Sequence, residues 1–351
     1  METEKPISQQ DSKLINMETD EKQMPTQEDH SNSCVGVNIP VITLNSGHDI
    51  PVMAFGTSSF PPLQVDQMRS ILLEAIEIGY RHIDTAALYE VEEGVGAGIK
   101  AALEKGLVKR EELFVTTKLW CDNAHPDRVL PAIKESLRKL GLEYVDLYLI
   151  HAAATVAPNI AYAAWKKGEV FPLDIKSVWA AMEEVQKLGL AKSIGVSNFT
   201  CKKLTELLAH AKIIPAINQV EMHAAMRQKK LREFCKEKGI HVSAYSPLGG
   251  REWGFDVVLG NELLKEIARN KEKSVAQIAL RWVYEQGAVV ITKSFNKERL
   301  KENLYIFDWK LTDEELKKTE LIPQVRTAPL NDFVFEGSPF KTVEEFWDGE
   351  M

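Results

Sequence analysis

Four side chains stand where short apolar runs end in the first half of the chain. Asp84, Lys118 and His151 each close such a run or directly follow it, and Tyr89 lies five residues beyond Asp84. If the runs are successive parallel strands, these side chains meet at one rim. An ammonium about 4 Å from a phenol oxygen favours the phenolate by about 4 kcal/mol at an effective dielectric near 20. Lys118 could thus make Tyr89 a proton donor, while Asp84 holds Lys118 charged and neutral His151 orients a carbonyl group.

Each of these side chains also has an ordinary structural interpretation. Asp84 could cap a helix, Tyr89 could be a half-buried aromatic, Lys118 could be solvated, and His151 could be a hydrogen-bonded polar residue. The set is more informative than its members, because a lysine and an aspartate buried at neighbouring strand ends must pair. His151 has no neighbour at metal-ligand spacing, so the pattern predicts no metal site.

The elements that must position these residues alternate regularly from Ile39 onward. Eight strand-then-helix units favour an α/β fold, a (β/α)8 TIM barrel with long βα loops that carry the active site. An N-terminal β-hairpin, with strands in 41–44 and 50–52, is expected before the barrel because Asn45-Ser46-Gly47 is a turn sequence. The expected strands are 52–55, 82–84, 114–117, 145–150, 192–195, 216–220, 241–245 and 289–292, and the expected helices include 68–78, 92–104, 128–140, 178–188, 201–210, 230–238 and 275–284.

An open-sheet dehydrogenase is disfavoured because no G-x-G-x-x-G fingerprint follows the first strand. The nearest match, Gly94-Val95-Gly96-Ala97-Gly98, lies inside a helical pattern, where close helix packing is the better interpretation.

Composition limits the partners and the compartment. A chain of 351 residues suits one barrel with extensions, and its net charge of −8 disfavours nucleic acid. No apolar run approaches the roughly 20 residues of a membrane span. The four cysteines are scattered without a CxxC motif, which indicates reduced thiols and a cytoplasmic protein. Residues 1–38 are polar and aperiodic, so we expect a disordered extension before a single barrel domain at 39–351, and the absence of heptads favours a monomer.

The local contexts of the four side chains resemble the aldo-keto reductase family. The similarity runs from about residue 40 to the C-terminus and implies that Asp84, Tyr89, Lys118 and His151 form the family's catalytic tetrad. Segments 194–199 and 218–221 also match the family. The segments around the tetrad are Gly79-Tyr80-Arg81-His82-Ile83-Asp84-Thr85-Ala86, Val115-Thr116-Thr117-Lys118-Leu119-Trp120 and Asp146-Leu147-Tyr148-Leu149-Ile150-His151.

The resemblance also implies an NADPH site. Independently of it, Lys293 and Arg299 follow the eighth strand, where such barrels bind phosphate. Two cations suit a 2′-phosphate and favour NADP over NAD. The implied contacts are Ser197, Asn198 and Gln219 to the carboxamide, Tyr245 stacked on the nicotinamide, Ser246 and Leu248 along the pyrophosphate, Lys293, Ser294, Phe295, Arg299, Glu302 and Asn303 at the adenosine end, and Thr57 with Asp84 beside them.

Within the family the chain is most similar to plant reductases of alkaloids and polyketide intermediates. Ala152-Ala153-Ala154 and Ala224-Ala225-Met226 stand where that branch carries bulkier residues, so we expect an enlarged substrate pocket, unless the loop 152–174 refills it. The expected substrate is a ketone or aldehyde on a bulky, ring-containing, alkaloid-like metabolite. A polyketide-intermediate reductase and a non-catalytic, NADPH-binding regulatory barrel stay open as alternatives. The candidate pocket walls are Ser58, Phe60, Trp120, His151, Ala152, Met226 and Trp253.

Overall fold

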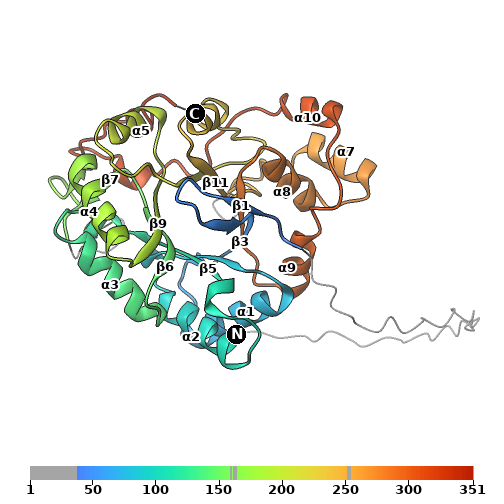
Figure 1. Ribbon diagram of the computed structural model, residues 1–351. Helices are drawn as coiled ribbons and strands as arrows, with labels where there is room; N and C mark the ends of the chain where they lie inside the picture. Colours follow the sequence, from blue (N-terminus) through green and yellow to red (C-terminus); the bar gives the residue numbers. More distant parts are fainter. Residues whose placement is uncertain (1–37, 159, 161–163, 251–253, 351) are drawn as a thin grey trace, which may run out of the picture. The chain divides into compact units, whose positions relative to one another are not determined.

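The barrel predicted from the sequence is present in the computed structural model, which describes residues 38–158, 160, 164–250 and 254–350. Eight parallel strands close on themselves in the order β3, β4, β5, β6, β9, β10, β11, β12, and the strands and the helices around them can be followed in Figure 1. The predicted extension at 1–38 lies outside the described residues apart from Asn38 and stays a prediction, as does the domain boundary. The strands are β3 (Met53–Gly56), β4 (His82–Asp84), β5 (Phe114–Leu119), β6 (Val145–Ile150), β9 (Ala191–Ser197), β10 (Ile217–Glu221), β11 (His241–Tyr245) and β12 (Val289–Thr292).

One helix or a pair of helices follows each barrel strand. Those after the successive strands are α1 (Val65–Ile78), α2 (Glu92–Glu104), α3 (Val129–Leu140), α4 (Ile175–Lys187), α5 (Cys201–Leu208), α6 (Lys229–Glu237), α7 (Glu262–Lys271) with α8 (Val275–Glu285), and α9 (Lys297–Leu304). The chain then continues through α10 (Asp313–Thr319), the 3-10 turn η5 (Asn331–Phe333) and α11 (Val343–Phe346).

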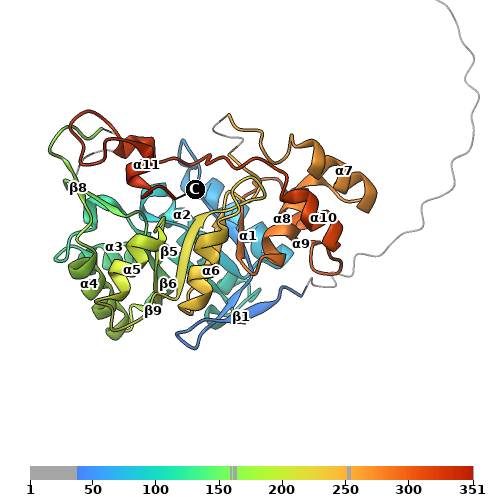
Figure 2. The same cartoon turned by 90° about the horizontal axis from the view of Figure 1, so that it is seen from above.

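Two short hairpins stand outside the barrel. The predicted N-terminal hairpin consists of β1 (Val41–Thr43) and β2 (Asp49–Pro51), paired antiparallel. Ile50 and Leu44 are buried in a cluster with barrel residues such as Phe114 and Val289, so this hairpin seals one end of the barrel. The second hairpin, β7 (Ala154–Val156) with β8 (Val170–Pro172), lies where the sequence indicated only a loop. Figure 2 shows β1 at one end of the barrel and α11 at the other.

The glycines of α2 serve helix packing, as the sequence indicated. A Cβ atom on Gly94 would lie 2.7 Å from Met68 Cβ in α1, and one on Gly96 would lie 2.5 Å from the carbonyl oxygen of Leu140 in α3. Side chains at these positions would push the neighbouring helices outward. The helix α2 directly follows the turn that carries Tyr89.

No helix within the described part of the chain is long and apolar enough to cross a membrane.

Candidate active site

A cavity of about 980 Å³ opens at the carboxyl ends of the barrel strands, opposite the N-terminal hairpin. Most of the residues that the sequence singled out line this cavity, although they come from the ends of all eight barrel strands and the loops after them. They are Thr57, Ser58, Phe60, Asp84, Tyr89, Trp120, His151, Ala152, Ser197, Asn198, Gln219, Tyr245, Ser246, Leu248, Lys293 and Arg299.

Lys118 lies directly behind the cavity wall and is completely buried. Its Nζ donates to Asp84 Oδ1 at 2.6 Å, to the Thr85 carbonyl oxygen at 2.9 Å and to Tyr89 Oη at 3.3 Å. Burial by itself lowers the pKa of Lys118, but Asp84 and Tyr89 together outweigh it, so the pKa is raised and the side chain stays charged. An ammonium has three donors and no acceptor. Tyr89 Oη must therefore accept from Lys118, which directs its own proton away from the lysine.

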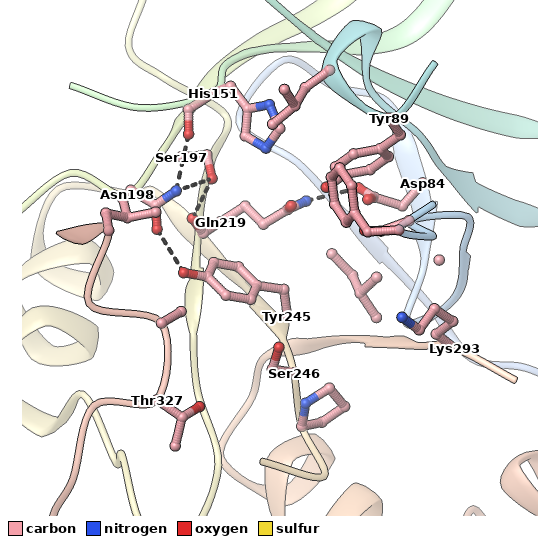
Figure 3. Close-up of a pocket in the computed structure, with 18 of the residues that line it drawn as sticks. Asp84, Tyr89, His151, Ser197, Asn198, Gln219, Tyr245, Ser246, Lys293 and Thr327 are labelled. Atoms are coloured by element: carbon pink, nitrogen blue, oxygen red, sulfur yellow. Dashed lines mark hydrogen bonds between the residues drawn. The ribbon is translucent and has the colours of Figure 1, made fainter. Parts of the chain in front are cut away.

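Register and a short turn bring these groups together. Asp84 ends β4 beside Thr116 of β5, which places it next to Lys118 two residues further along β5. Tyr89 ends the 3-10 turn η1 (Ala87–Tyr89), and its backbone N–H donates to the Ala86 carbonyl at 3.1 Å. The second carboxylate oxygen of Asp84 accepts from Gln219 Nε2 at 2.8 Å (Figure 3), so both of its oxygens are hydrogen-bonded.

His151 faces Tyr89 across the cavity. The two rings meet edge to face with centroids 5.5 Å apart, and the Trp120 ring lies 5.1 Å from the imidazole on another side. Burial, and then the charge of Lys118, hold the pKa of His151 well below its ordinary value. The imidazole is therefore neutral and keeps one N–H donor for a carbonyl oxygen. Its Nδ1 is buried and has no hydrogen-bond partner among the described residues.

Amide and hydroxyl groups line the floor beside the tetrad. Asn198 has φ 61°, in the left-handed region, and its side chain donates to the His151 carbonyl at 2.9 Å. Its amide oxygen accepts from Tyr245 Oη at 2.9 Å, and Ser197 Oγ donates to the Gln219 carbonyl at 2.8 Å (Figure 3). Burial strongly raises the pKa of Tyr245, which therefore stays protonated. This floor presents polar groups and an aromatic side chain that could hold a planar ring bearing an amide.

Two cations, Lys293 and Arg299, lie at the adenosine end predicted for the cavity, after β12. Arg299 is exposed in the first turn of α9, whose cap residue Asn296 accepts from the Arg299 backbone N–H at 3.0 Å. Amide and hydroxyl donors, an aromatic side chain and two cations are the chemistry that a nicotinamide dinucleotide phosphate requires, so the donor set fits NADP.

Four other predicted cofactor residues are not among the described residues that line the cavity. Ser294 is buried and hydrogen-bonded to Asn296, whereas Phe295 is exposed. Asn303 is buried and donates to Thr292 Oγ1 at 3.2 Å, so it supports the end of β12 from behind. Glu302 accepts from Gln277 through its backbone carbonyl.

The pocket walls also differ in part from the expectation. Ala152 lines the cavity, but Ala153 and Ala154 are buried in core clusters. Trp253 lies outside the described residues, and Met226 is fully buried. Within the described chain, neither Met226 nor the alanines before it line the cavity. The reason is a tight turn, closed by paired His223 and Met226 backbone hydrogen bonds, that faces the chain beyond α10.

One wall, the segment from Thr327 to Asp332, has no counterpart among the sequence-based predictions. All six of its residues line the cavity, although the segment follows no barrel strand and has no periodic apolar pattern. Among the described residues, no cluster of three or more His, Cys, Asp or Glu could hold a metal ion.

Comparison with known proteins agrees with this geometry. The model of the aldo/keto reductase family matches residues 52–322. The chain is 56% identical to the 7-acetyl-epi-neemfruitin B aldo-keto reductase of Melia azedarach over 90% of this chain and 99% of that protein. It is 51% identical to an NADPH-dependent codeinone reductase of Papaver somniferum over 88% and 98% of the two chains, and 50% identical to rhazimal reductase 2 of Alstonia scholaris over 90% and 99%.

Solved structures give the same result. An aldo-keto reductase of Bombyx mori in complex with NADP is 40% identical and superposes with a TM-score of 0.75, covering 86% of this chain and 98% of that one. The aldose reductase of Schistosoma japonicum is 32% identical with a TM-score of 0.78, covering 84% and 96%. The chain therefore belongs to the aldo/keto reductase family.

Proposed function

We propose that this protein uses NADPH to reduce the ketone or aldehyde of a bulky, ring-containing metabolite to the alcohol, with Tyr89 as the proton donor. The observation that carries the proposal is the threefold donation of Lys118 to Asp84, the Thr85 carbonyl and Tyr89. A purely structural lysine at this position would need Asp84 but would have no need of a cavity-lining phenol.

The cofactor is proposed from the donor set and supported by the relatives, of which one is named NADPH-dependent and one holds NADP. When bound, NADPH supplies a hydride. Ser197, Asn198 and Gln219 would hold its carboxamide beside the face of Tyr245, and Lys293 with Arg299 would hold its phosphates. Each of these residues lines the cavity.

Side chains of the protein orient the carbonyl oxygen and supply its proton. Neutral His151 donates a hydrogen bond to the carbonyl oxygen and so orients it. Tyr89 gives its proton to the same oxygen, because Lys118 stabilises the phenolate that is left behind. Asp84 and Gln219 keep the lysine in place without entering the reaction.

The substrate class follows from the cavity and from the names of the relatives. The cavity has a volume of about 980 Å³, which the cofactor and the substrate would share. Phe60, Trp120 and Leu330 give the substrate end apolar walls. The relatives are named for neemfruitin, codeinone and rhazimal compounds. We therefore propose a polycyclic or otherwise bulky carbonyl compound of specialised metabolism.

The deciding experiment is Tyr89→Phe in the full chain. Wild type should oxidise NADPH with members of a panel of cyclic ketones and aldehydes, with the alcohols identified by mass spectrometry. Tyr89→Phe should lose turnover by at least about a hundredfold and keep its affinity for NADPH, measured by fluorescence titration. Tyr305→Phe, at an exposed tyrosine, is the matched control. Unchanged turnover in Tyr89→Phe would exclude the proposed role, and wild-type NADPH binding without turnover on any substrate would favour a regulatory barrel instead.

A further inference from the structure

The wall formed by Thr327–Asp332 belongs to a longer segment, which we call the C-terminal strap (residues 325–350). The strap follows α10 and crosses to the loops after β9 and β10. Its first anchor is Glu221, the last residue of β10, which is fully buried. Glu221 Oε1 accepts from the Thr327 backbone N–H at 2.7 Å and from Thr327 Oγ1 at 2.6 Å, and Oε2 accepts from the Ala328 N–H at 3.0 Å. The strap is therefore fixed to the barrel where it enters the cavity wall.

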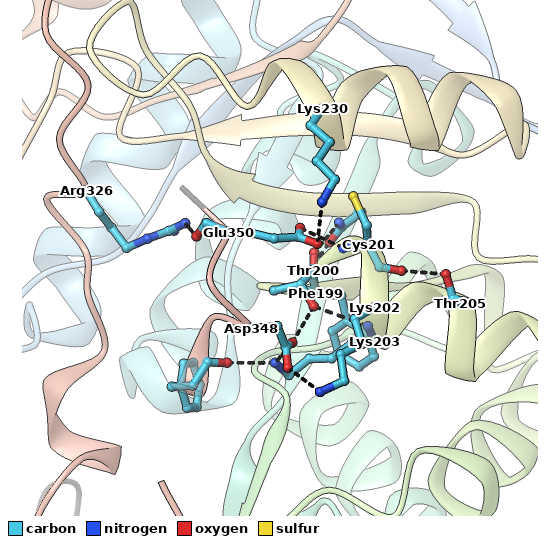
Figure 4. Close-up of polar contacts among 12 residues, drawn as sticks. Phe199, Thr200, Cys201, Lys202, Lys203, Thr205, Lys230, Arg326, Asp348 and Glu350 are labelled. Carbon is cyan, nitrogen blue, oxygen red and sulfur yellow. Dashed lines mark hydrogen bonds and ion pairs between the residues drawn. The ribbon is translucent and has the colours of Figure 1, made fainter. Parts of the chain in front are cut away.

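The far end of the strap has a second anchor at the start of α5. Thr200, the cap residue of α5, donates through Oγ1 to Asp348 Oδ2 at 2.7 Å, and Lys203 Nζ donates to the same oxygen (Figure 4). The Cys201 backbone N–H donates to Glu350 Oε2 at 2.9 Å. Two carboxylates thus occupy the positive end of a helix, where anionic groups are stabilised. We call Asp348 and Glu350 the latch carboxylates.

The chain between the two anchors folds back on the cavity wall. Trp347 Nε1 donates to the Pro329 carbonyl at 2.9 Å, which ties the residue before the first latch carboxylate to the wall itself. The Arg326 guanidinium lies 3.7 Å from the centroid of the Trp347 ring and also donates to the Glu350 carbonyl at 3.1 Å. A displacement of the latch would therefore pass directly to Pro329 and the residues after it.

The latch holds a backbone conformation that would otherwise be unfavourable. Asp348 has φ 54°, in the left-handed region that residues other than glycine adopt only occasionally. Its carboxylate is also lightly exposed, and bonds from Thr200 and Lys203 hold its pKa below the ordinary value despite burial. The bonds to α5 add to the backbone hydrogen bonds of this turn, in which the Gly349 N–H donates to the Glu344 carbonyl at 2.8 Å.

We propose that Asp348 and Glu350 are positioning residues for the substrate: by fastening the strap to α5, they hold Pro329–Asp332 at the distance from the tetrad that a bulky substrate requires. This inference rests on the proposed function. It predicts which side moves when the latch is lost, because the barrel side has other supports. Thr200 also accepts from the Lys203 backbone N–H at 3.2 Å, and Asn198 is held by Tyr245. The strap keeps the bonds from Trp165 to the Asp332 carbonyl and from Lys203 to the Phe346 carbonyl, so it should loosen rather than detach. The cofactor floor should not loosen.

The test is the double variant Asp348→Asn/Glu350→Gln, which keeps side-chain shape and removes both charges. With a ketone found by the panel, KM should rise by about tenfold or more, while kcat changes by less than about threefold and the NADPH dissociation constant by less than about twofold. Glu344→Gln is the matched control, because Glu344 lies on the strap, is exposed, and makes no side-chain hydrogen bond or ion pair with the described residues. Lys202→Ala is a second control, since it removes only an exposed contact to Asp348.

Hydrogen exchange of the NADPH complex tests, without any substrate, whether the latch carboxylates hold the strap. The double variant should exchange faster in residues 329–347 and at the wild-type rate in 191–199. If the panel yields no substrate, the proposed function fails, and exchange still decides whether the latch holds the strap. Unchanged KM and unchanged exchange in the double variant would overturn the inference, as would equal losses of ketone and NADPH affinity. If the double variant does not fold, the single variants Asp348→Asn and Glu350→Gln are measured in the same way, each with a smaller expected KM rise of about threefold.

Discussion

Replacing Lys118 by Met tests whether the lysine activates Tyr89. Nζ lies 3.3 Å from Tyr89 Oη. At that distance, and at an effective dielectric near 20, an ammonium favours the phenolate by about 5 kcal/mol. If about half of this interaction is present in the transition state, where the proton is only partly transferred, the barrier rises by about 2.5 kcal/mol. The expected fall in kcat is then roughly a hundredfold, within the range for a general acid.

The same substitution also removes the cation that pairs with the buried carboxylate of Asp84. Asp84 would keep its bond from Gln219 but lose the contact to Lys118 at 2.6 Å. Breaking a buried pair in this way costs roughly 3–5 kcal/mol of unfolding free energy. The double variant Lys118→Met/Asp84→Asn removes both charges, so it should recover much of that stability without recovering kcat. This difference separates loss of chemistry from loss of fold.

The assay is NADPH oxidation at saturating ketone, with urea unfolding and NADPH titration on the same preparations. Lys100→Met serves as the control, because among the described residues Lys100 makes only an exposed pair with Glu104. The double variant should show the low kcat of Lys118→Met together with near-native stability. A folded, NADPH-bound Lys118→Met protein whose kcat lies within threefold of wild type would refute the assigned role of the lysine.

Two further predictions concern the cofactor and the pH dependence of stability. Arg299→Ala should raise the NADPH dissociation constant by about tenfold or more, because one charge-assisted hydrogen bond is lost. The dissociation constant for NADH should change little. If fluorescence titrations show equal losses of affinity for NADPH and NADH, Arg299 does not bind the 2′-phosphate. Burial, the largest effect, lowers the pKa of His82 to about 4, so between pH 6.5 and 4 the unfolded chain binds a proton that the folded chain does not. The unfolding free energy should therefore fall by about 2 kcal/mol from pH 7 to pH 5, as urea titrations of wild type would measure, and His82→Gln should lack that part of the decrease; parallel pH slopes would contradict this explanation.

The barrel and the tetrad could be predicted because their determinants are local. Each strand is a short apolar run, and strand ends of a parallel barrel must meet at one rim, so Asp84, Lys118 and His151 converge whatever the loops do. The exact ends of the strands were predicted less accurately. The sequence placed the end of β5 at Thr117, whereas the strand continues to Leu119. Lys118 is thus part of a buried strand rather than a residue that follows it.

The less local features were predicted poorly, and for a physical reason. The sequence predicts that the alanines before Met226 enlarge the pocket. Their surroundings, however, depend on chain that lies about a hundred residues further on, where the Val325 N–H donates to the Ala225 carbonyl at 2.7 Å. The same holds for the cavity wall at Thr327. Its position is set by a carboxylate on β10 and by two others near the C-terminus, and no periodicity links these positions in the sequence.

The catalytic groups and the substrate wall are held in place by different kinds of contact. The groups that do the chemistry are held by strand register, which tolerates little change because a shift of one residue would reverse the side chains of a whole strand. The strap is held instead at Glu221, at the latch carboxylates and by Trp165, which donates to the Asp332 carbonyl and stacks on Phe333. Substitutions between the anchors can reshape the substrate wall while the tetrad and the cofactor floor keep their own supports. The anchors hold the strap in place but do not themselves contact the substrate. We therefore expect the residues between them, above all Leu330–Asp332, to determine which substrate is preferred.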